Sequence, residues 1–313
     1  MKQVTTIAAM KAACRQVMRS GKTLGFVPTM GALHEGHLSL VRASKARCDV
    51  TAVSVFVNPL QFGPAEDLDK YPRDLASDAG MLEKLGVELL FAPTTDEMYG
   101  AQVSGGQNAA NPGYHLPTLP PKDGEKGGAP TEEGKTYVLV EGLSGKLDGA
   151  SRPTHFRGVS TVVTKLFEIV RPDYAFFGQK DAVQLAVLRK MARDLDMDVE
   201  LVVCPIVREA DGLAMSSRNV YLTPEQRRQA LVLHRALLRV QMEADRGERD
   251  GEKLGAIGAG VVAEEPGARL DYFAVVDPDT IEPVTDVSRG ALVAVAAYFG
   301  STRLLDNIVL APR

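Results

Sequence analysis

Cysteine is scarce in this chain of 313 residues, and the three that occur, Cys14, Cys48 and Cys204, stand far apart. An odd number of widely spaced cysteines does not suit a disulfide framework, and no two of them have the spacing of a zinc finger. The cysteine content therefore favours a reducing compartment over a disulfide-stabilised secreted domain.

Long apolar runs are also missing. The first 21 residues, MKQVTTIAAMKAACRQVMRSG, lack the uninterrupted apolar core of a signal peptide. The longest late apolar run, Ala291–Phe299, is too short to span a bilayer. We therefore expect a cytoplasmic protein with no membrane partner.

A surplus of positive charge is absent as well. The chain has 36 Lys and Arg against 40 Asp and Glu, a net charge of −4, which argues against a nucleic-acid partner bound through a large basic surface. The remaining composition, 45% hydrophobic and 24% charged, is that of a soluble protein with one large domain or two smaller ones.

Apolar segments alternate with helical patterns through the first two-thirds of the chain. The patterns predict strands over 23–27, 50–57, 87–92, 174–177 and 201–207, and helices over 36–48, 73–85, 159–170 and 181–194. Strands that alternate with helices indicate an α/β fold, a Rossmann-like doubly wound parallel sheet.

The last third has a different order. Thr223 and Pro224 are typical of a helix start, and they predict a long helix to about residue 245. A second helical stretch and three apolar segments follow, over 272–276, 291–298 and 307–310. This order predicts a smaller α+β domain, and we place the boundary between residues 206 and 207.

The segment 101–134 breaks the pattern, with 7 Gly and 5 Pro in 34 residues. Such a composition buries too little apolar surface to offset its ordering entropy. We interpret it as a mobile surface loop, with a lid or partner-binding segment as the alternative.

The most informative motif is His34-Glu-Gly-His37, which joins an apolar segment to a helical pattern. Two histidines three residues apart at a helix start lie on one face, at the end of the helix that attracts anions. A zinc site is an alternative, although helical zinc pairs usually have i, i+4 spacing, and incidental surface histidines are another. The Pro-Thr-Met-Gly sequence before the motif favours nucleotide binding.

Four further motifs place polar side chains at predicted strand ends or helix starts. Asn58 and Gln61 follow the most apolar strand, and Gly178 and Lys180 follow a later one, with Gln184 one helical turn further. The other two motifs are Ser151-Arg-Pro-Thr-His-Phe-Arg-Gly158 and Met215-Ser-Ser-Arg-Asn219, in which Arg forks suit phosphates and carboxylates. Each motif taken alone is also compatible with a solvated polar turn.

The ordered set of these motifs resembles the pantothenate synthetase (pantoate–β-alanine ligase) family. The resemblance is carried by 27–37 (VPTMGALHEGH), 57–62 (VNPLQF), 71–73 (YPR), 151–158 (SRPTHFRG), 177–181 (FGQKD) and 215–219 (MSSRN). It covers nearly the whole chain outside 101–134. That segment is longer than the usual connection in the family, and we expect it to leave the active site intact because closure entropy grows only slowly with loop length.

The resemblance implies an ATP-dependent ligase with two steps. Pantoate attacks the α-phosphate of ATP to give a pantoyl adenylate and pyrophosphate, and the β-alanine amine then displaces AMP to give pantothenate. It also implies a homodimer and Mg²⁺ that accompanies ATP. With the boundary placed from the sequence pattern, we expect a catalytic domain over 1–206 and a domain over 207–313 that closes over the ATP site.

The resemblance further implies residue roles. Catalysis is assigned to His34, His37, Lys180 and Arg218, with the histidines as hydrogen-bond donors to phosphate and Lys180 neutralising the leaving group. ATP binding is assigned to Met30, Gly31, Ala32, Leu33, His34, Glu35, Gly36, His37, Gly178, Gln179, Lys180, Asp181, Val207, Met215, Ser216, Ser217 and Arg218. Gln61 and Gln184 are expected to bind pantoate, and Gln61 is also expected to bind β-alanine. Further members of the cleft are expected at Asn58, Tyr71, Arg152 and His155. No side chain is expected to hold the metal, because Mg²⁺ would be bound chiefly through the phosphates of ATP.

Three other functions remain as alternatives. A nucleotidylyltransferase shares the HxGH motif but keeps the nucleotide on its product, and a tRNA synthetase would need a tRNA-binding extension. A nucleotide-sensing protein would bind ATP without pantoate-dependent chemistry. The Asn58–Gln61 and Met215–Arg218 motifs together favour the ligase.

Overall fold

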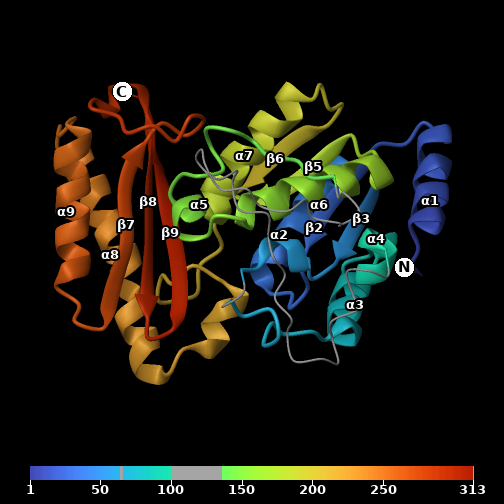
Figure 1. Cartoon of the computed structure of the whole chain (residues 1–313), viewed down its shortest axis with the longest axis horizontal. Coiled ribbons are helices and arrows are strands. Elements are labelled where there is room, and N and C mark those ends of the chain that lie inside the picture. Colours follow the sequence, from blue (N-terminus) through green and yellow to red (C-terminus); the bar gives the residue numbers. More distant parts are fainter. Residues whose placement is uncertain (64–65, 101–135, 313) are drawn as a thin grey trace, which may run out of the picture.

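The computed structural model describes residues 1–63, 66–100 and 136–312, and its core is a six-stranded sheet in the order β1-β4-β3-β2-β5-β6 (Figure 1). Every pairing between neighbouring strands of this sheet is parallel. The strands are β1 (Lys2–Val4), β2 (Leu24–Thr29), β3 (Val50–Val55), β4 (Leu89–Phe91), β5 (Tyr174–Gly178) and β6 (Glu200–Cys204).

Helices cover both faces of the sheet, as its apolar strands require. Successive residues of a strand point to opposite faces. Phe26 therefore packs in the core under α1 (Ile7–Arg19), α6 (His155–Val170) and α7 (Ala182–Asp194). Its neighbour Val27 packs in a second core under α2 (Glu35–Arg47) and α3 (Leu75–Lys84). Shorter helices are α4 (Thr95–Tyr99), α5 (Asp148–Ser151) and the 3-10 turns η1 (Pro59–Gln61), η2 (Gln179–Asp181), η3 (Ser217–Tyr221) and η4 (Val287–Arg289).

The order of the strands reverses between β2 and β5. The chain places β3 and β4 on one side of β2, and then returns to place β5 directly against its other side. Ligands of open α/β sheets bind outside the carboxyl ends of the strands at such a point. The His34–His37 segment leaves β2 and the Lys180 segment leaves β5. Topology therefore brings these two predicted phosphate-binding segments together.

A second sheet is formed by the last third of the chain. The strands β7 (Ala268–Val276), β8 (Ala291–Phe299) and β9 (Thr302–Leu310) pair antiparallel, and α8 (Pro224–Asp245) and α9 (Gly251–Ala263) pack against them. In Figure 1 the helices α8 and α9 lie on the side of this sheet away from the parallel sheet, and β9 is the strand nearest to the larger domain. The start of α8 is a capping box in which Thr223 and Gln226 bond each other's backbone.

The predicted fold class is confirmed, with several differences in element bounds. The short strand β1 and the helix α1 were not predicted, and α6 begins at His155 rather than near residue 159. The strand β9 begins at Thr302 rather than at 307. Its first half was not recognised because it includes charged residues, which form ion pairs inside the structure. The boundary at residue 206 stays a prediction, and the predicted loop over 101–134 lies outside the described residues.

Among residues 1–63, 66–100 and 136–312, no helix is both long enough and apolar enough to cross a bilayer.

Candidate active site

A cavity of about 1100 Å³ lies at the carboxyl ends of β2, β3 and β5 and extends beneath the turn between β8 and β9. It brings together most of the predicted functional side chains. Those that line it are Met30, His37, Asn58, Gln61, Tyr71, Arg152, His155, Lys180, Asp181, Gln184, Ser216 and Arg218. The cavity therefore joins residues from all six motif segments that carry the family resemblance.

The other predicted site residues do not line this cavity. They are Gly31, Ala32, Leu33, His34, Glu35, Gly36, Gly178, Gln179, Val207, Met215 and Ser217. Glu35 is exposed and forms an ion pair with Arg42. The Met215 N–H donates to the carbonyl of Val207, so these two residues shape the backbone before Ser216.

The turn between β2 and α2 is held by Asp78 of α3. The Asp78 carboxylate is 3% exposed and accepts the N–H groups of Ala32 and Leu33 at 3.0 and 2.8 Å. Gly31 and Ala32 have positive φ values of 82° and 50°, so the turn needs such support. Sequence reasoning missed Asp78. Its only signal is a carboxylate on the face of α3 that also carries buried Leu82.

The hydrogen bonds of the two motif histidines fix their tautomers. The Gly36 N–H donates to Nδ1 of His34 at 3.1 Å, and the His34 N–H donates to Nδ1 of His37 at 3.4 Å. A nitrogen that accepts carries no proton, so each neutral ring carries its proton on Nε2. Because His37 lines the cavity, it presents an N–H donor to a ligand there.

Both histidines are neutral at physiological pH. Burial lowers the pKa of His37 to about 3, and the neighbouring His34 and Lys180 act in the same direction. Burial also lowers the pKa of His34, followed by the charge of Lys180. Each ring is therefore available as a neutral hydrogen-bond donor through Nε2.

Asn58 and Gln61 form a buried amide pair at the end of β3. The Nδ2 of Asn58 donates to the Gly158 carbonyl at 3.1 Å and to Oε1 of Gln61 at 3.2 Å, and Tyr99 donates its hydroxyl to Oδ1 of Asn58 at 2.7 Å. Gln61 places its Nε2 beside Sδ of Met30, at 2.7 Å. These contacts orient an amide group toward the cavity.

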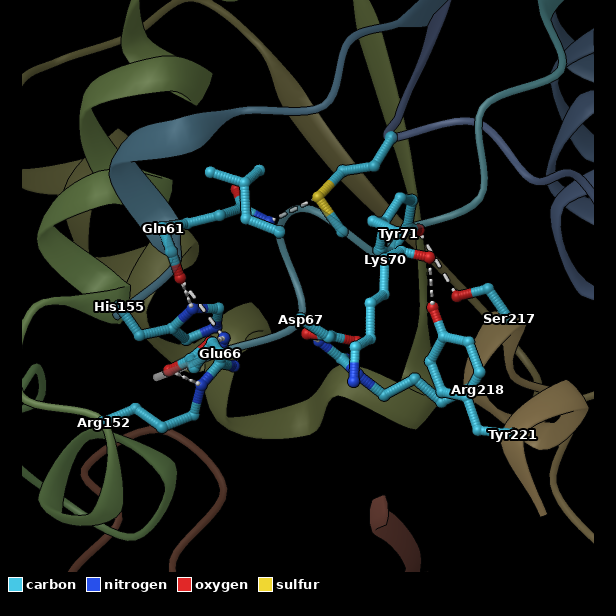
Figure 2. Close-up of polar contacts among 12 residues, drawn as sticks. Gln61, Glu66, Asp67, Lys70, Tyr71, Arg152, His155, Ser217, Arg218 and Tyr221 are labelled. Atoms are coloured by element: carbon cyan, nitrogen blue, oxygen red, sulfur yellow. Dashed lines mark hydrogen bonds and ion pairs between the residues drawn. The ribbon is translucent and has the colours of Figure 1, made fainter. Parts of the chain in front are cut away.

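Two arginine forks in the cavity are held by adjacent acidic residues, as Figure 2 shows. Glu66 pairs with Arg152 through both carboxylate oxygens, and Asp67 pairs with Arg218 through two bonds of 3.0 Å. Burial alone would raise the pKa of Asp67, but the hydrogen bonds and charge of Arg218 outweigh burial and lower it. Sequence reasoning missed Glu66 and Asp67 as cavity members, although they follow the Asn58–Gln61 motif closely.

His155 has the opposite tautomer to His37. Its Nδ1 lies 2.9 Å from the Gln61 carbonyl oxygen, which can only accept, so Nδ1 carries the proton and Nε2 is the acceptor (Figure 2). Burial, followed by the charge of Arg152, lowers the pKa of His155 to about 4. One cavity thus contains a neutral imidazole that donates through Nε2 and another that accepts through Nε2.

Lys180 and Ser216 contribute a cation and a hydroxyl group to the lining. Lys180 lies in η2 with its Nζ 3.4 Å from Oδ1 of Asp181. Oγ of Ser216 accepts the Arg218 N–H at 3.3 Å, and the neighbouring Ser217 hydroxyl lies 3.3 Å from that of Tyr71. The cavity is also lined by Tyr298 and by residues 301–305. These residues were not predicted, since no sequence motif marks them as part of a site.

The described residues contain no cluster of three or more His, Cys, Asp and Glu side chains suited to a metal ion. The cavity carboxylates of Glu66 and Asp67 are already engaged by arginines. Within the described residues, no group of this kind completes the zinc alternative for His34 and His37.

The chemical capacity of the cavity follows from its lining. Neutral N–H donors, a lysine and an arginine suit a polyphosphate, whose negative charge they stabilise. The side-chain amides of Gln61 and Gln184 suit carboxylate and hydroxyl groups. The cavity can therefore hold a nucleotide next to a small hydroxy acid.

Comparison with known proteins gives a family match along nearly the whole chain. The family model described as Pantoate-beta-alanine ligase matches residues 2–309. The chain is 54% identical over 310 residues to the pantothenate synthetase of Koribacter versatilis, covering 99% of this chain and 96% of that protein. It is 50% identical over 305 residues to that of Pelotomaculum thermopropionicum, covering 97% of each.

Solved structures give the same result. The fold is similar to the pantothenate synthetase of Thermus thermophilus, with a TM-score of 0.84 at 43% identity and full coverage of both chains. It is also similar to the pantoate-beta-alanine ligase of Francisella tularensis, complexed with beta-gamma ATP and beta-alanine. That match has a TM-score of 0.71 at 28% identity and covers 99% of this chain and 97% of that one.

Proposed function

The chain belongs to the pantoate–β-alanine ligase family and is a ligase, and on this premise we propose that it joins (R)-pantoate to β-alanine through a pantoyl adenylate, releasing AMP and pyrophosphate. One observation supports this proposal above the others. His37, Gln61 and Lys180 follow three different strands of the parallel sheet, and all three line one cavity at its switch point.

In the first step a pantoate carboxylate oxygen attacks the α-phosphorus of ATP. A P–O bond forms, the bond to the pyrophosphate oxygen breaks, and no proton has to be removed from the attacking group. Gln61 and Gln184 would orient pantoate, while the Nε2–H of His37 donates to phosphate oxygens as their charge develops. Lys180, Ser216 and Arg218 would bind the phosphates and stabilise the leaving pyrophosphate.

In the second step the β-alanine nitrogen attacks the acyl carbon. The nitrogen attacks as the neutral amine: the C–N bond forms, the C–O bond to the α-phosphate breaks, AMP leaves with the electron pair, and the proton that the nitrogen loses is released to solvent. Gln61 would position β-alanine beside the adenylate, and positioning is the main contribution because no covalent enzyme intermediate is needed. Asn58 holds Gln61 in place through the 3.2 Å bond between their amides.

Mg²⁺ and a second subunit are part of the proposal. When bound with ATP, Mg²⁺ would neutralise phosphate charge, and we propose that it is held chiefly through the phosphates of ATP. We also propose a homodimer in the cytoplasm, as the family resemblance implies.

Gly158→Ala is expected to raise the KM for pantoate by about 10-fold and to lower stability by about 1–3 kcal/mol, as overpacking does. A Cβ at Gly158 would lie 2.1 Å from the Leu60 carbonyl oxygen and 2.6 Å from the Gln61 nitrogen, so the turn that carries Gln61 must move. Steady-state kinetics and thermal unfolding measure the two effects.

Gly80→Ala is the matched control, because this helical glycine has no atom within 4 Å of an added Cβ. It should leave the KM for pantoate unchanged. An unchanged KM in the folded Gly158→Ala variant would contradict the placement of Gln61 in the pantoate site.

The proposed intermediate is tested by exchange of labelled pyrophosphate into ATP. Exchange should occur with pantoate and Mg²⁺ in the absence of β-alanine, and it should stop when pantoate is omitted. A folded, Mg²⁺-supplied sample that shows no exchange would count decisively against an adenylate. Release of free AMP on addition of β-alanine separates the ligase from a nucleotidylyltransferase, whose product keeps the nucleotide.

A further inference from the structure

Strand β9 carries two adjacent buried polar residues, Asp306 and Asn307, each 2% exposed. Neighbouring residues of a strand point to opposite faces of the sheet. Both can be buried only because β9 is covered on both sides, by α8 on one and by η2 on the other. Neither residue lines the large cavity, whose lining stops at Leu305.

The Asn307 side chain is bonded to the turn that carries Lys180. Its Nδ2 donates to the carbonyl oxygens of Gln179 and Lys180 at 3.0 and 2.9 Å, and its Oδ1 accepts from Nε2 of Gln179 at 3.0 Å. Both amide hydrogens and the amide oxygen are therefore used. A buried amide with all its groups paired holds its partners in one geometry.

The Asp306 side chain is bonded to the segment before the Ser216–Arg218 loop. Its carboxylate pairs with Arg208 through two bonds of 2.6 and 2.9 Å, and Arg208 also donates to the carbonyl of Gly212. Arg208 and Ala214 form an isolated β-bridge, which closes a short hairpin. The chain that leaves this hairpin at Ala214 enters the Ser216–Arg218 loop two residues later, after Met215.

Two consecutive residues of one strand thus hold the two cationic segments of the cavity. We propose that Asp306 and Asn307 are positioning residues that set the separation between Lys180 and the Ser216–Arg218 loop, so that both reach the polyphosphate of one ATP. This inference rests on the proposed use of ATP. It gives the antiparallel sheet a role in ATP binding beyond covering the site.

The test is the dissociation constant for ATP with Mg²⁺, measured by calorimetry without other substrates. Asn307→Asp keeps the shape of the side chain but turns a carboxylate toward two carbonyl oxygens. We expect the affinity for ATP to fall about 10-fold, a size that matches the loss of a buried hydrogen bond. On a Lys180→Ala background the same change should weaken ATP binding less than about 2-fold. If Asn307 acts through Lys180, the effects of the two substitutions on the binding free energy are not additive.

Asp306→Asn is the second arm, paired with Arg218→Ala in the same way, and Asn307→Ser replaces Asn307→Asp if the latter does not fold. Leu310→Ala is the control for general destabilisation, since Leu310 is buried in the same strand and packs in the hydrophobic core with α8 and α9, which includes no residue of 179–181 or 216–218. It should lower the melting temperature and leave the dissociation constant unchanged.

Additive effects in both double variants would overturn the proposal, as would an unchanged affinity in Asn307→Asp. An equal loss of affinity in Leu310→Ala would overturn it too. Pyrophosphate exchange is run on the same samples. Coupled loss of ATP affinity in a protein without pantoate-dependent exchange would support the positioning role and reject the proposed reaction, so the two failures are distinguishable.

Discussion

His37→Ala is expected to lower kcat for pantothenate formation by about 10²–10³-fold, the usual effect of removing one donor to a developing negative charge. The ring presents Nε2–H to the cavity because its Nδ1 is occupied by the His34 N–H. Stability should fall only modestly, since the lost backbone contact is a single bond of 3.4 Å at the start of α2. Turnover and thermal unfolding of the purified variant measure both effects.

His37→Gln separates hydrogen-bond donation from proton transfer. Glutamine suits this position of a capping box, and its amide can donate from near the place of Nε2 but cannot exchange a proton with the substrate. We expect His37→Gln to retain at least about 10-fold more activity than His37→Ala, within the range that a hydrogen-bond donor contributes. Equal activity of the two variants would contradict a donor role.

The pH profile provides an independent check. With its pKa lowered to about 3 by burial, His37 is neutral throughout the range from pH 5 to pH 8. The pH profiles of kcat/KM for the unaltered protein and for His37→Gln should therefore have the same shape near the ordinary histidine pKa. A step that is present in the unaltered protein and absent from His37→Gln would show that His37 changes protonation during turnover.

Lys180→Ala is expected to lower the rate of pantoate-dependent pyrophosphate exchange by about 10²–10³-fold, because in the proposed reaction the variant loses the charge that neutralises the leaving group. Lys180 lies in η2 at the end of β5, opposite the His37 helix across the switch point of the sheet. The second step should be affected less, since no pyrophosphate leaves in it. Rapid-quench measurement of the two half-reactions tests this difference.

Lys180→Arg is the control for charge alone. It keeps a cation but replaces a compact ammonium with a planar fork. We expect partial recovery of exchange relative to Lys180→Ala. Equal losses in both half-reactions of Lys180→Ala would instead indicate a general distortion of the cavity.

Much of the fold was accessible from the sequence because it depends on local patterns. The apolar run of β3 and the Thr223 and Pro224 signals of α8 could be recognised without knowing the tertiary structure. The strand β1 has three residues and too short a pattern to be recognised. Strand β9 was predicted too short because Arg303 and Asp306 appear polar in sequence, yet both pair inside the protein.

The candidate site likewise has residues that local motifs reveal and residues that they do not. Residues in compact motifs, such as His37 and Lys180, were identified and lie in one cavity, and their catalytic roles stay predictions. Their supporting partners were missed because they are distant in sequence. Asp78 lies 46 residues from Ala32, and Asn307 lies 127 residues from Lys180. Such pairings depend on how the chain folds back, which no local pattern specifies.

The opposite tautomers of His37 and His155 also have a consequence for inhibitor design. A compound that fills the cavity meets a neutral donor at His37 and a neutral acceptor at His155. A molecule with an acceptor such as a sulfonyl oxygen at one end and an N–H at the other would match both, whereas its reversed isomer would face like groups at each end. The positions of the two ring protons therefore favour one orientation of such a compound over its reversed isomer.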